Sequence, residues 1–355
     1  MQEPIFTPQR AAVFIGVHHF CDTVSALANL LLFFLIIFRT SRGFRSYSII
    51  LACTTCSELV LGASSMFAMP RLVPIDLSLA YQFHGLCRYF HPLSCGIAQS
   101  VTSHCISYSY TLMPLSFWYR HHVIKHKAPP TARIAFYCFL VYVPAFITMI
   151  LHIVAFVEAD SAYIYKILAE KRPESLWPNN PRIAVVTGFR SMLDIETFLL
   201  IVWVCMPVFP GYAISIYYRQ KILRKLNSDI AMSKKTRAAQ KSLVTALGLQ
   251  ALLPFFCMSQ SAFYIWKQFE FPGVAYLPYY EEWVFLSLAV ASSISPFITI
   301  WFVKPYRECC LKPIFRILVC LKVPMRTRSA KVRYFTRTSE TAESQKGQTE
   351  TNDIC

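Results

Sequence analysis

Three polar side chains stand inside long apolar segments and are the first candidates for chemistry. Asn29, Glu58 and Ser295 each lie about nine to twelve residues from one end of such a segment. A helical rise of about 1.5 Å per residue would place them roughly 13–18 Å inside a membrane. A carboxyl group at that depth must be paired, hydrated or protonated, because an isolated charge in hydrocarbon is costly. Two interpretations stay open: a polar switch between two helix packings, and a protonated structural glutamate bonded to one neighbour.

Prolines inside the apolar segments are the second candidates. Pro254 in LQALLPFFC and Pro296 in SISPFIT cannot donate a backbone hydrogen bond, so each can kink its helix. A kink allows one half of a helix to swing, which a conformational relay needs. We therefore group both prolines with the polar switch. The simpler interpretation is that proline is more frequent in membrane helices.

One apolar segment, near 94–118, carries many hydroxyl, amide and imidazole groups. Gln99, Ser103 and Ser107 recur at the helical i, i+4 spacing and form one polar stripe. Such a stripe can line a ligand cavity or serve only hydrogen bonds between helices. The candidate ligand-binding residues combine it with neighbouring polar groups: Gln99, Ser103, His104, Ser107, Asp194 and Glu196.

The composition indicates a membrane protein. Of 355 residues, 55% are hydrophobic and only 15% are charged, whereas soluble domains carry about 25% charged residues. The net charge is +16, and the basic residues lie between the apolar segments. This distribution favours an anionic membrane surface over nucleic acid as the partner. The thirteen cysteines fit no zinc framework and we find no nucleotide-binding or hydrolase motif. We therefore predict no enzymatic activity, no cofactor and no metal.

Seven segments are long and apolar enough to span a membrane. We predict an all-α membrane protein, a seven-transmembrane-helix bundle with the polar third helix at its centre, where its side chains avoid lipid. The predicted spans are 13–38, 47–69, 94–118, 134–157, 194–218, 242–266 and 283–303. The predicted regions are an extracellular N-terminus (1–12), the bundle (13–303), a juxtamembrane cytoplasmic segment (304–323) and a disordered cytoplasmic tail (324–355).

The distribution of Lys and Arg predicts the orientation. With the N-terminus outside, the cytoplasmic connections hold 26 of the 35 basic residues, as the positive-inside rule requires. The C-terminus is then cytoplasmic. In the stretch LSFWYRHHVIKHKAPP, apolar character changes to positive charge at Arg120. On this topology, Arg120 marks the point where the third helix leaves the membrane.

The predicted cytoplasmic surface has candidate contacts for a signalling partner, though for a single lysine anionic lipid is the simpler contact. For Arg120, partner contact and an intramolecular lock both stay open. The candidates are Tyr119, Arg120, Lys234, Lys235 and Arg237.

Cysteines near the predicted membrane faces suggest covalent modification. Cys87 and Cys95 lie near the outer end of the third span, where the compartment is oxidising. A disulfide between them and a bond to Cys21 are both open. Cys309 and Cys310 follow the seventh span on the inner side, as palmitoylated cysteines often do, with reduced thiols as the alternative.

Three stretches carry a resemblance to a known family: CRYFHPLSC leading to LSFWYRHHVI, MSKKTRAAQKSLVTALGLQALLPFF, and SISPFITIWFVKPYR. The chain resembles the nematode serpentine chemoreceptors of the Str superfamily, and most closely class delta (Srd), over about residues 15–310. The resemblance implies a G-protein-coupled receptor in the plasma membrane, in sensory cilia of chemosensory neurons. It would detect an external small molecule such as an odorant and signal to a heterotrimeric G protein through helix rearrangement. A seven-helix ligand-gated channel and a membrane transporter remain alternatives, and pairing with a second receptor stays open.

The chain departs from the wider rhodopsin-like receptors at their motifs. Trp118 replaces the acid before Arg120, so an Arg-to-acid lock within that motif cannot form. Ser295 and Thr299 stand for the Asn and Tyr of NPxxY, and Glu58 stands for an Asp. The tryptophan of CWxP is absent before Pro254. The loop 158–192 has no cysteine. We expect activation to differ in detail from the rhodopsin-like route.

Overall fold

The computed structural model describes residues 8–40, 42–176, 184–228, 232–269 and 280–320. Residues 1–309 form one compact unit and 310–355 a second. The predicted tail 324–355 lies outside the described residues, as do residues 1–7 of the predicted N-terminal region.

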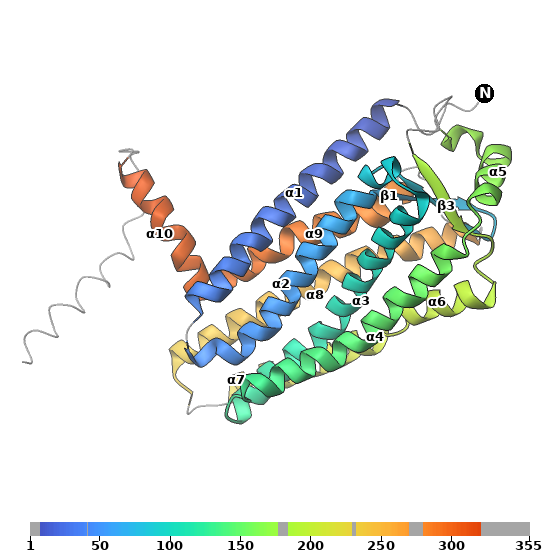
Figure 1. The fold of residues 1–355 in the computed structure, drawn as a ribbon. Helices are drawn as coiled ribbons and strands as arrows, with labels where there is room; N and C mark the ends of the chain where they lie inside the picture. The colour runs from blue at the N-terminus through green and yellow to red at the C-terminus, as the bar shows by residue number, and fades with distance from the viewer. Residues whose placement is uncertain (1–7, 41, 177–183, 229–231, 270–279, 321–355) are drawn as a thin grey trace, which may run out of the picture. The chain divides into compact units, whose positions relative to one another are not determined.

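In the described part of the first unit, seven long helical segments form the bundle, which confirms the predicted fold class (Figure 1). The segment built from α6 and α7 is interrupted at Pro207, which has no N–H to continue a helical ladder. Helix α10 (Lys304–Cys320) begins in the first unit and continues into the second. The seven segments are α1 (Pro8–Arg39), α2 (Arg45–Ala68), α3 (Pro92–Lys125), α4 (Thr131–Val157), α6 (Ile195–Cys205) with α7 (Val208–Ser228), α8 (Lys234–Gln268) and α9 (Tyr280–Phe302).

Helix α3 is the polar member of the bundle and lies at its centre. Six helices of the described chain are long and apolar enough to cross a membrane, and α3 is not among them. It packs against α2, α4, α7 and α8. All residues of α3 are described, and Ile97 is its one well-exposed large hydrophobic side chain. Helix α4, by contrast, exposes Phe136, Phe139 and Leu140, as expected of a helix that faces lipid.

Hydrogen bonds to the neighbouring helices satisfy polar groups of α3. The hydroxyls of Ser64 (α2) and Thr102 (α3) are 2.9 Å apart. Tyr108 donates its hydroxyl to the Cys138 carbonyl oxygen of α4 at 3.2 Å. A polar group without a partner is costly in an apolar setting, so these bonds hold α3 between α2 and α4.

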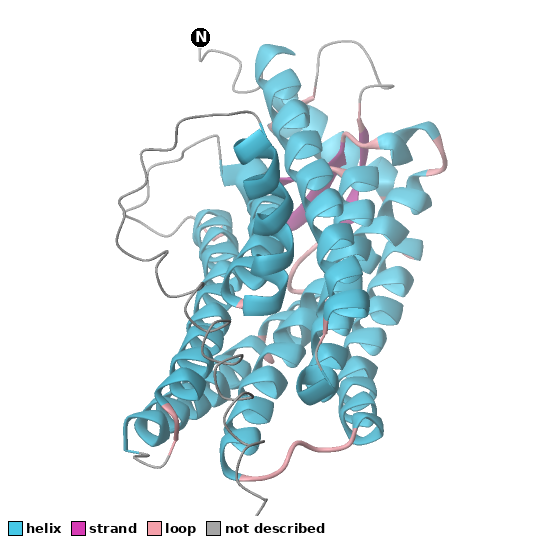
Figure 2. Ribbon diagram, turned by 90° about the vertical axis from the view of Figure 1, so that its left-hand side faces the viewer, coloured by secondary structure: helices cyan, strands magenta, loops and turns pink. Residues whose placement is uncertain are grey.

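A three-stranded antiparallel sheet covers one end of the bundle, which we call the sheet end (Figure 2). Its strands are β1 (Pro70–Ile75), β2 (Ser78–Phe83) and β3 (Val185–Phe189), in that order. A two-residue turn joins β1 to β2, with Ile75 opposite Ser78 and Asp76 in the left-handed region at φ 46°. The sequence did not predict these strands, because β1 contains two prolines and the turn lacks the Asn-Gly or Asp-Gly signal of a hairpin.

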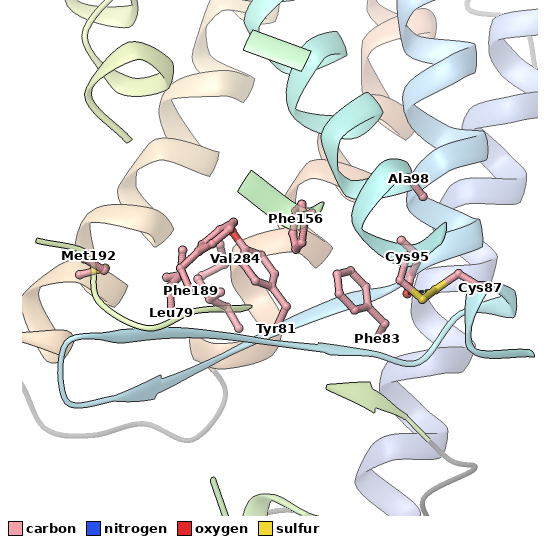
Figure 3. Packing of buried hydrophobic residues seen from close by; sticks show 12 residues of the cluster. Leu79, Tyr81, Phe83, Cys87, Cys95, Ala98, Phe156, Phe189, Met192 and Val284 are labelled. Carbon is pink, nitrogen blue, oxygen red and sulfur yellow. Dashed lines mark hydrogen bonds between the residues drawn. A yellow bond between two sulfur atoms is a disulfide. The ribbon is translucent and has the colours of Figure 1, made fainter. Parts of the chain in front are cut away.

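The two faces of the sheet pack against different parts of the chain. Leu79, Tyr81 and Phe83 alternate along β2 and point toward the helices, where Phe156 of α4 meets them (Figure 3). On the other face, Ala80 packs against α5 (Ser161–Lys171). Further residues of this second cluster are Val73, Ile75, Ile164 and Leu168. The sheet is therefore held between the bundle and α5.

Buried ion pairs attach the start of α9 to the sheet and to α1. Arg71 of β1 pairs with Glu281 of α9, and the two side chains are only 0% and 1% exposed. Arg172, which follows α5, reaches the other oxygen of Glu281 at 2.9 Å. Arg10 of α1 pairs with Glu282 at 2.9 Å. The start of α9 thus binds three other elements at the sheet end.

We expect the replacement Arg71→Gln to lower the free energy of unfolding by about 3–5 kcal/mol, because it leaves the Glu281 carboxylate buried with reduced compensation. Thermal unfolding of the purified protein in lipid nanodiscs measures the change. The control is Arg190→Gln, which removes an exposed pair with Asp160 and should have little effect. Equal thermal midpoints for Arg71→Gln and the control would contradict a structural role for the buried pair.

Candidate functional site

A cavity of about 290 Å³, which we call the His152 cavity, lies between the sheet and the helices α3, α4, α6, α8 and α9. Gln99 and Ser103 are among the residues that line it. His104, Ser107, Asp194 and Glu196 are not among the described residues that line it. The structure therefore brings two of the six predicted ligand-binding residues together.

The four other residues lie outside the His152 cavity because of their helix positions or their charge. One step along α3 from Ser103 turns His104 toward α4, where its ring lies 5.0 Å from that of Tyr142. Ser107 is half-buried outside the cavity wall. Asp194 and Glu196 begin α6 with exposed side chains, because ionised carboxylates favour water over an apolar cavity.

Sequence reasoning missed several residues of the His152 cavity. His152 of α4 is 5% exposed and lines the wall. The available signal was a lone imidazole within an apolar span. Tyr81 and Phe189 come from strands that were not predicted, so no pattern placed them at the site.

A second cavity of about 120 Å³, the Glu58 cavity, lies deeper in the bundle. Asn29, Glu58, Pro254 and Ser295 line it, so four of the five predicted switch residues meet there. Pro296 lies inside α9 but is not among the described lining residues.

Hydrogen bonds in the Glu58 cavity connect α2, α8 and α9. Ser295 of α9 donates to Oε1 of Glu58 in α2 at 2.8 Å. Gln250 of α8, which was not predicted, donates from Nε2 to Thr299 Oγ1 at 2.8 Å and to Ser295 Oγ at 3.3 Å. Asn29 of α1 donates to the Ser25 carbonyl oxygen, at 3.0 Å. Movement of α8 or α9 would therefore break bonds made to Glu58 and Thr299.

Four residues separate the two cavities and line both, and we call them the partition. They are Ile106 and Tyr110 of α3, Cys257 of α8 and Leu288 of α9. Because protein interiors are close-packed, displacement of a partition residue by a molecule in the His152 cavity changes the wall of the Glu58 cavity.

Arg120 is buried at the end of the bundle opposite the sheet. Helix α3 continues past Arg120 to Lys125. The guanidinium carbon lies 3.6 Å from the ring centre of Tyr47 and 4.8 Å from that of Phe44, with the side chain only 2% exposed. Its Nε and Nη2 have no hydrogen-bond partner among the described residues. Aromatic faces attract cations, so the rings of Tyr47 and Phe44 stabilise the buried Arg120 cation. No acid precedes Arg120 in the sequence, because Trp118 and Tyr119 stand there.

Tyr47 connects this cation to the Glu58 cavity, because it also lines that cavity. Its ring centre lies 5.3 Å from that of Tyr119, which is buried. The other predicted partner residues are at the start of α8, where Lys234 is exposed, Lys235 follows it and Arg237 is half-buried.

The predicted cysteines occupy different environments. Cys87 and Cys95 form a disulfide beside the sheet, while Cys21 is buried with a free thiol. Cys309 is half-buried in the first unit. Cys310 is half-buried and belongs to the second unit.

The sequence matches the family model of the serpentine type 7TM GPCR chemoreceptor Srd over residues 14–312. The chain belongs to the Srd family. Two similar relatives from Caenorhabditis elegans are serpentine receptor class delta-3, 29% identical over 83% of this chain and 86% of that relative, and serpentine receptor class delta-1, 28% identical over 85% and 81%. The crystal structure of squid rhodopsin matches with a TM-score of 0.59 at 12% identity, covering 87% of this chain and 82% of that chain.

The predicted resemblance is confirmed, and the chain is a multi-pass membrane protein of the GPCR type. At 12% identity, the likeness to squid rhodopsin shows the shared seven-helix fold alone.

His84 is a buried titratable group at the sheet end, between β2 and the spans. It is 4% exposed, and its ring lies 5.9 Å from that of Phe14. Burial, followed by the nearby charges of Arg71 and Arg88, lowers its pKa to about 3. The imidazole is therefore neutral when the protein is folded at pH 5–7.

We expect this Srd protein to lose stability as the pH falls below about 6.5, since the unfolded chain then binds a proton at His84 and the folded chain does not. At pH 5 the loss from this group is about 2 kcal/mol. Thermal unfolding at pH 7.5 and pH 5, in the wild type and in His84→Phe, measures it. Other groups titrate in both proteins, so an equal loss in the two would contradict the assignment to His84.

Proposed function

We propose that this Srd chain is a chemosensory receptor that binds an external small molecule in the His152 cavity and signals to a heterotrimeric G protein. The sheet end and the N-terminus face outside, and the Arg120 end and the C-terminus face the cytoplasm. The placement of 26 of 35 basic residues in the cytoplasmic connections of this topology supports it. The family's description as chemoreceptors supports the sensory role.

The continuous path between the two ends of the bundle carries this proposal. The partition joins the His152 cavity to the Glu58 cavity, and Tyr47 joins the Glu58 cavity to Arg120. A ligand that binds better to one helix packing shifts the population toward that packing. The hydrogen bonds of Gln250, Ser295 and Glu58 are the contacts that differ between the two packings, and α8 moves about Pro254.

In the proposed resting state, Tyr47 and Phe44 hold Arg120 away from the cytoplasmic surface. Release of Arg120 opens a surface for the G protein together with the start of α8. The partner contacts are Tyr119, Arg120, Lys234, Lys235 and Arg237. Of these, Tyr119 and Arg120 are buried in the described structure, so the surface forms only after the helices move.

Three further features complete the proposal. Cys309 and Cys310 carry palmitoyl groups that hold α10 at the inner leaflet, beside anionic lipids. The receptor acts in the plasma membrane of sensory cilia. Residues 1–12 are extracellular, 304–323 lie along the membrane and 324–355 form a cytoplasmic tail.

We expect Tyr47→Leu to raise ligand-independent nucleotide exchange on the G protein, because the variant loses the aromatic face that holds Arg120. A desolvated cation–π contact of about 2 kcal/mol corresponds to a shift of up to roughly 30-fold. The assay uses the receptor in nanodiscs with purified heterotrimers. Tyr47→Phe, which keeps the ring, is the matched control and should stay near the wild-type rate. An unchanged rate for Tyr47→Leu would count against the lock.

A second variant tests the polar switch. Glu58→Gln keeps an acceptor for Ser295 but removes the ionisable group, and we expect basal exchange to change by roughly 5-fold or more, the range of typical coupling energies. Thr54→Val is the control, because Thr54 lines the same cavity but donates its hydroxyl within its own helix, to the Ile50 carbonyl at 3.0 Å. Normal signalling by Glu58→Gln would leave Glu58 a structural group and would reject the switch.

A further inference from the structure

The wall of the His152 cavity defines a class of ligand, and this inference rests on the proposed function. Most of the wall is aromatic or aliphatic, including Tyr81, Phe189, Met192 and Phe285. Among the described residues that line the cavity there is no Asp, Glu, Lys or Arg. A charged molecule would give up its hydration here without a counter-charge, which disfavours binding.

Two polar side chains on this wall are buried. Gln99 is 1% exposed and His152 is 5% exposed. Within the described chain, Oε1 of Gln99 and Nδ1 of His152 have no hydrogen-bond partner. Buried polar groups normally have partners, and leaving one without a partner is costly. A ligand group that bonds both atoms would remove that cost.

The packing of α3 against α4 places these two side chains on neighbouring turns. Gly96 approaches Phe156 so closely that an added Cβ would lie 2.7 Å from its ring. Gln99 lies about one turn after Gly96 in α3, and His152 lies about one turn before Phe156 in α4. Because consecutive helices joined by a short connection run antiparallel, Gln99 and His152 come from facing turns. Stacking on Phe156, at 5.2 Å and 19°, fixes the plane of the imidazole.

The cavity volume limits the size of the ligand. An apolar cavity of about 150 Å³ takes up one benzene molecule. By the same measure, about 290 Å³ has room for roughly 10–12 non-hydrogen atoms.

We propose that the His152 cavity binds an uncharged, mainly apolar molecule of this size whose hydroxyl group is held between Gln99 and His152. A hydroxyl suits the pair because it both donates and accepts. It donates to Oε1 of Gln99 and accepts from His152 in the tautomer that carries the ring proton on Nδ1. The aromatic walls from β2, β3 and α9 enclose the rest of the molecule.

A matched set of probes tests the proposal: 4-phenyl-1-butanol, butylbenzene, 4-phenylbutanoate and 4-phenylbutylammonium. Their apparent dissociation constants for the full-length receptor in nanodiscs follow from the concentration dependence of the thermal midpoint. We expect the alcohol to bind roughly tenfold more tightly than each of the other three. Equal binding of all four, preference for a charged probe, or no binding by the alcohol overturns the proposal.

Variants assign the preference to the two side chains. Gln99→Leu and His152→Phe should each remove the roughly tenfold advantage of the alcohol over butylbenzene. Ser100→Ala is the matched control, because Ser100 is buried beside Gln99 but bonds to its own helix, at the Gly96 carbonyl. An alcohol preference that survives in both variants overturns the assignment. If a variant does not fold, the wild-type comparison of the four probes still decides the ligand class.

The same nanodiscs separate this inference from the proposed function. Nucleotide exchange on the G protein is measured with each probe and with Tyr47→Leu. Exchange that responds to Tyr47→Leu while the alcohol preference is absent overturns the ligand class alone. Absence of exchange in every condition, with the alcohol preference intact, overturns the proposed coupling and leaves the ligand site standing.

Discussion

The arrangement of the bundle depends on the cost of placing polar side chains against lipid. Helix α3 carries amide, hydroxyl and imidazole groups along its whole length, and hydrocarbon offers them no partners. Surrounding helices therefore enclose it, and its polar groups bond to α2 and α4. Because α3 is enclosed, it forms a wall of both cavities and carries Arg120 into a buried position.

Helix α9, like α3, extends from the sheet end to the Glu58 cavity. Its start is held by buried ion pairs to Arg71 and Arg172. Farther along, Leu288 belongs to the partition, and Ser295 and Thr299 bond within the Glu58 cavity. The sheet, which also lines the His152 cavity, is thus connected through α9 to the polar groups deeper in the bundle. Rigid helices with bonded contacts at both ends are suited to carry such coupling.

The sequence was informative where a single segment carries the physical signal. Apolar runs gave the seven helices, and the polar content of residues 94–118 gave the central position of α3. The depth of Asn29, Glu58 and Ser295 along their own segments predicted that they meet, and they line one cavity. Patterns of this kind are local, so they can be read without knowledge of how segments pack.

The remainder depends on packing between distant segments. The two prolines of β1 argued against a strand in the sequence. They are tolerated because β1 is an edge strand and pairs on one side only. Arg120 was assigned to the membrane surface because apolar character changes to positive charge there. The aromatic rings of Phe44 and Tyr47 that bury it come from a different part of the chain. His152 lines a cavity whose wall also includes residues of β2 and β3, and these strands were not predicted. Such contacts leave no periodic signal.

The enclosure of α3 is the claim that labelling from within the membrane tests most directly. A lipid carrying a photoactivated carbene precursor in its acyl chain is placed in nanodiscs with the receptor, and labelled peptides are mapped by mass spectrometry. Exposed residues of α4 such as Phe139 and Leu140 provide the internal reference. We predict dense labelling of α4 and labelling of α3 confined to the region of Ile97. Labelling of α3 along its length at the level of α4 would contradict the account.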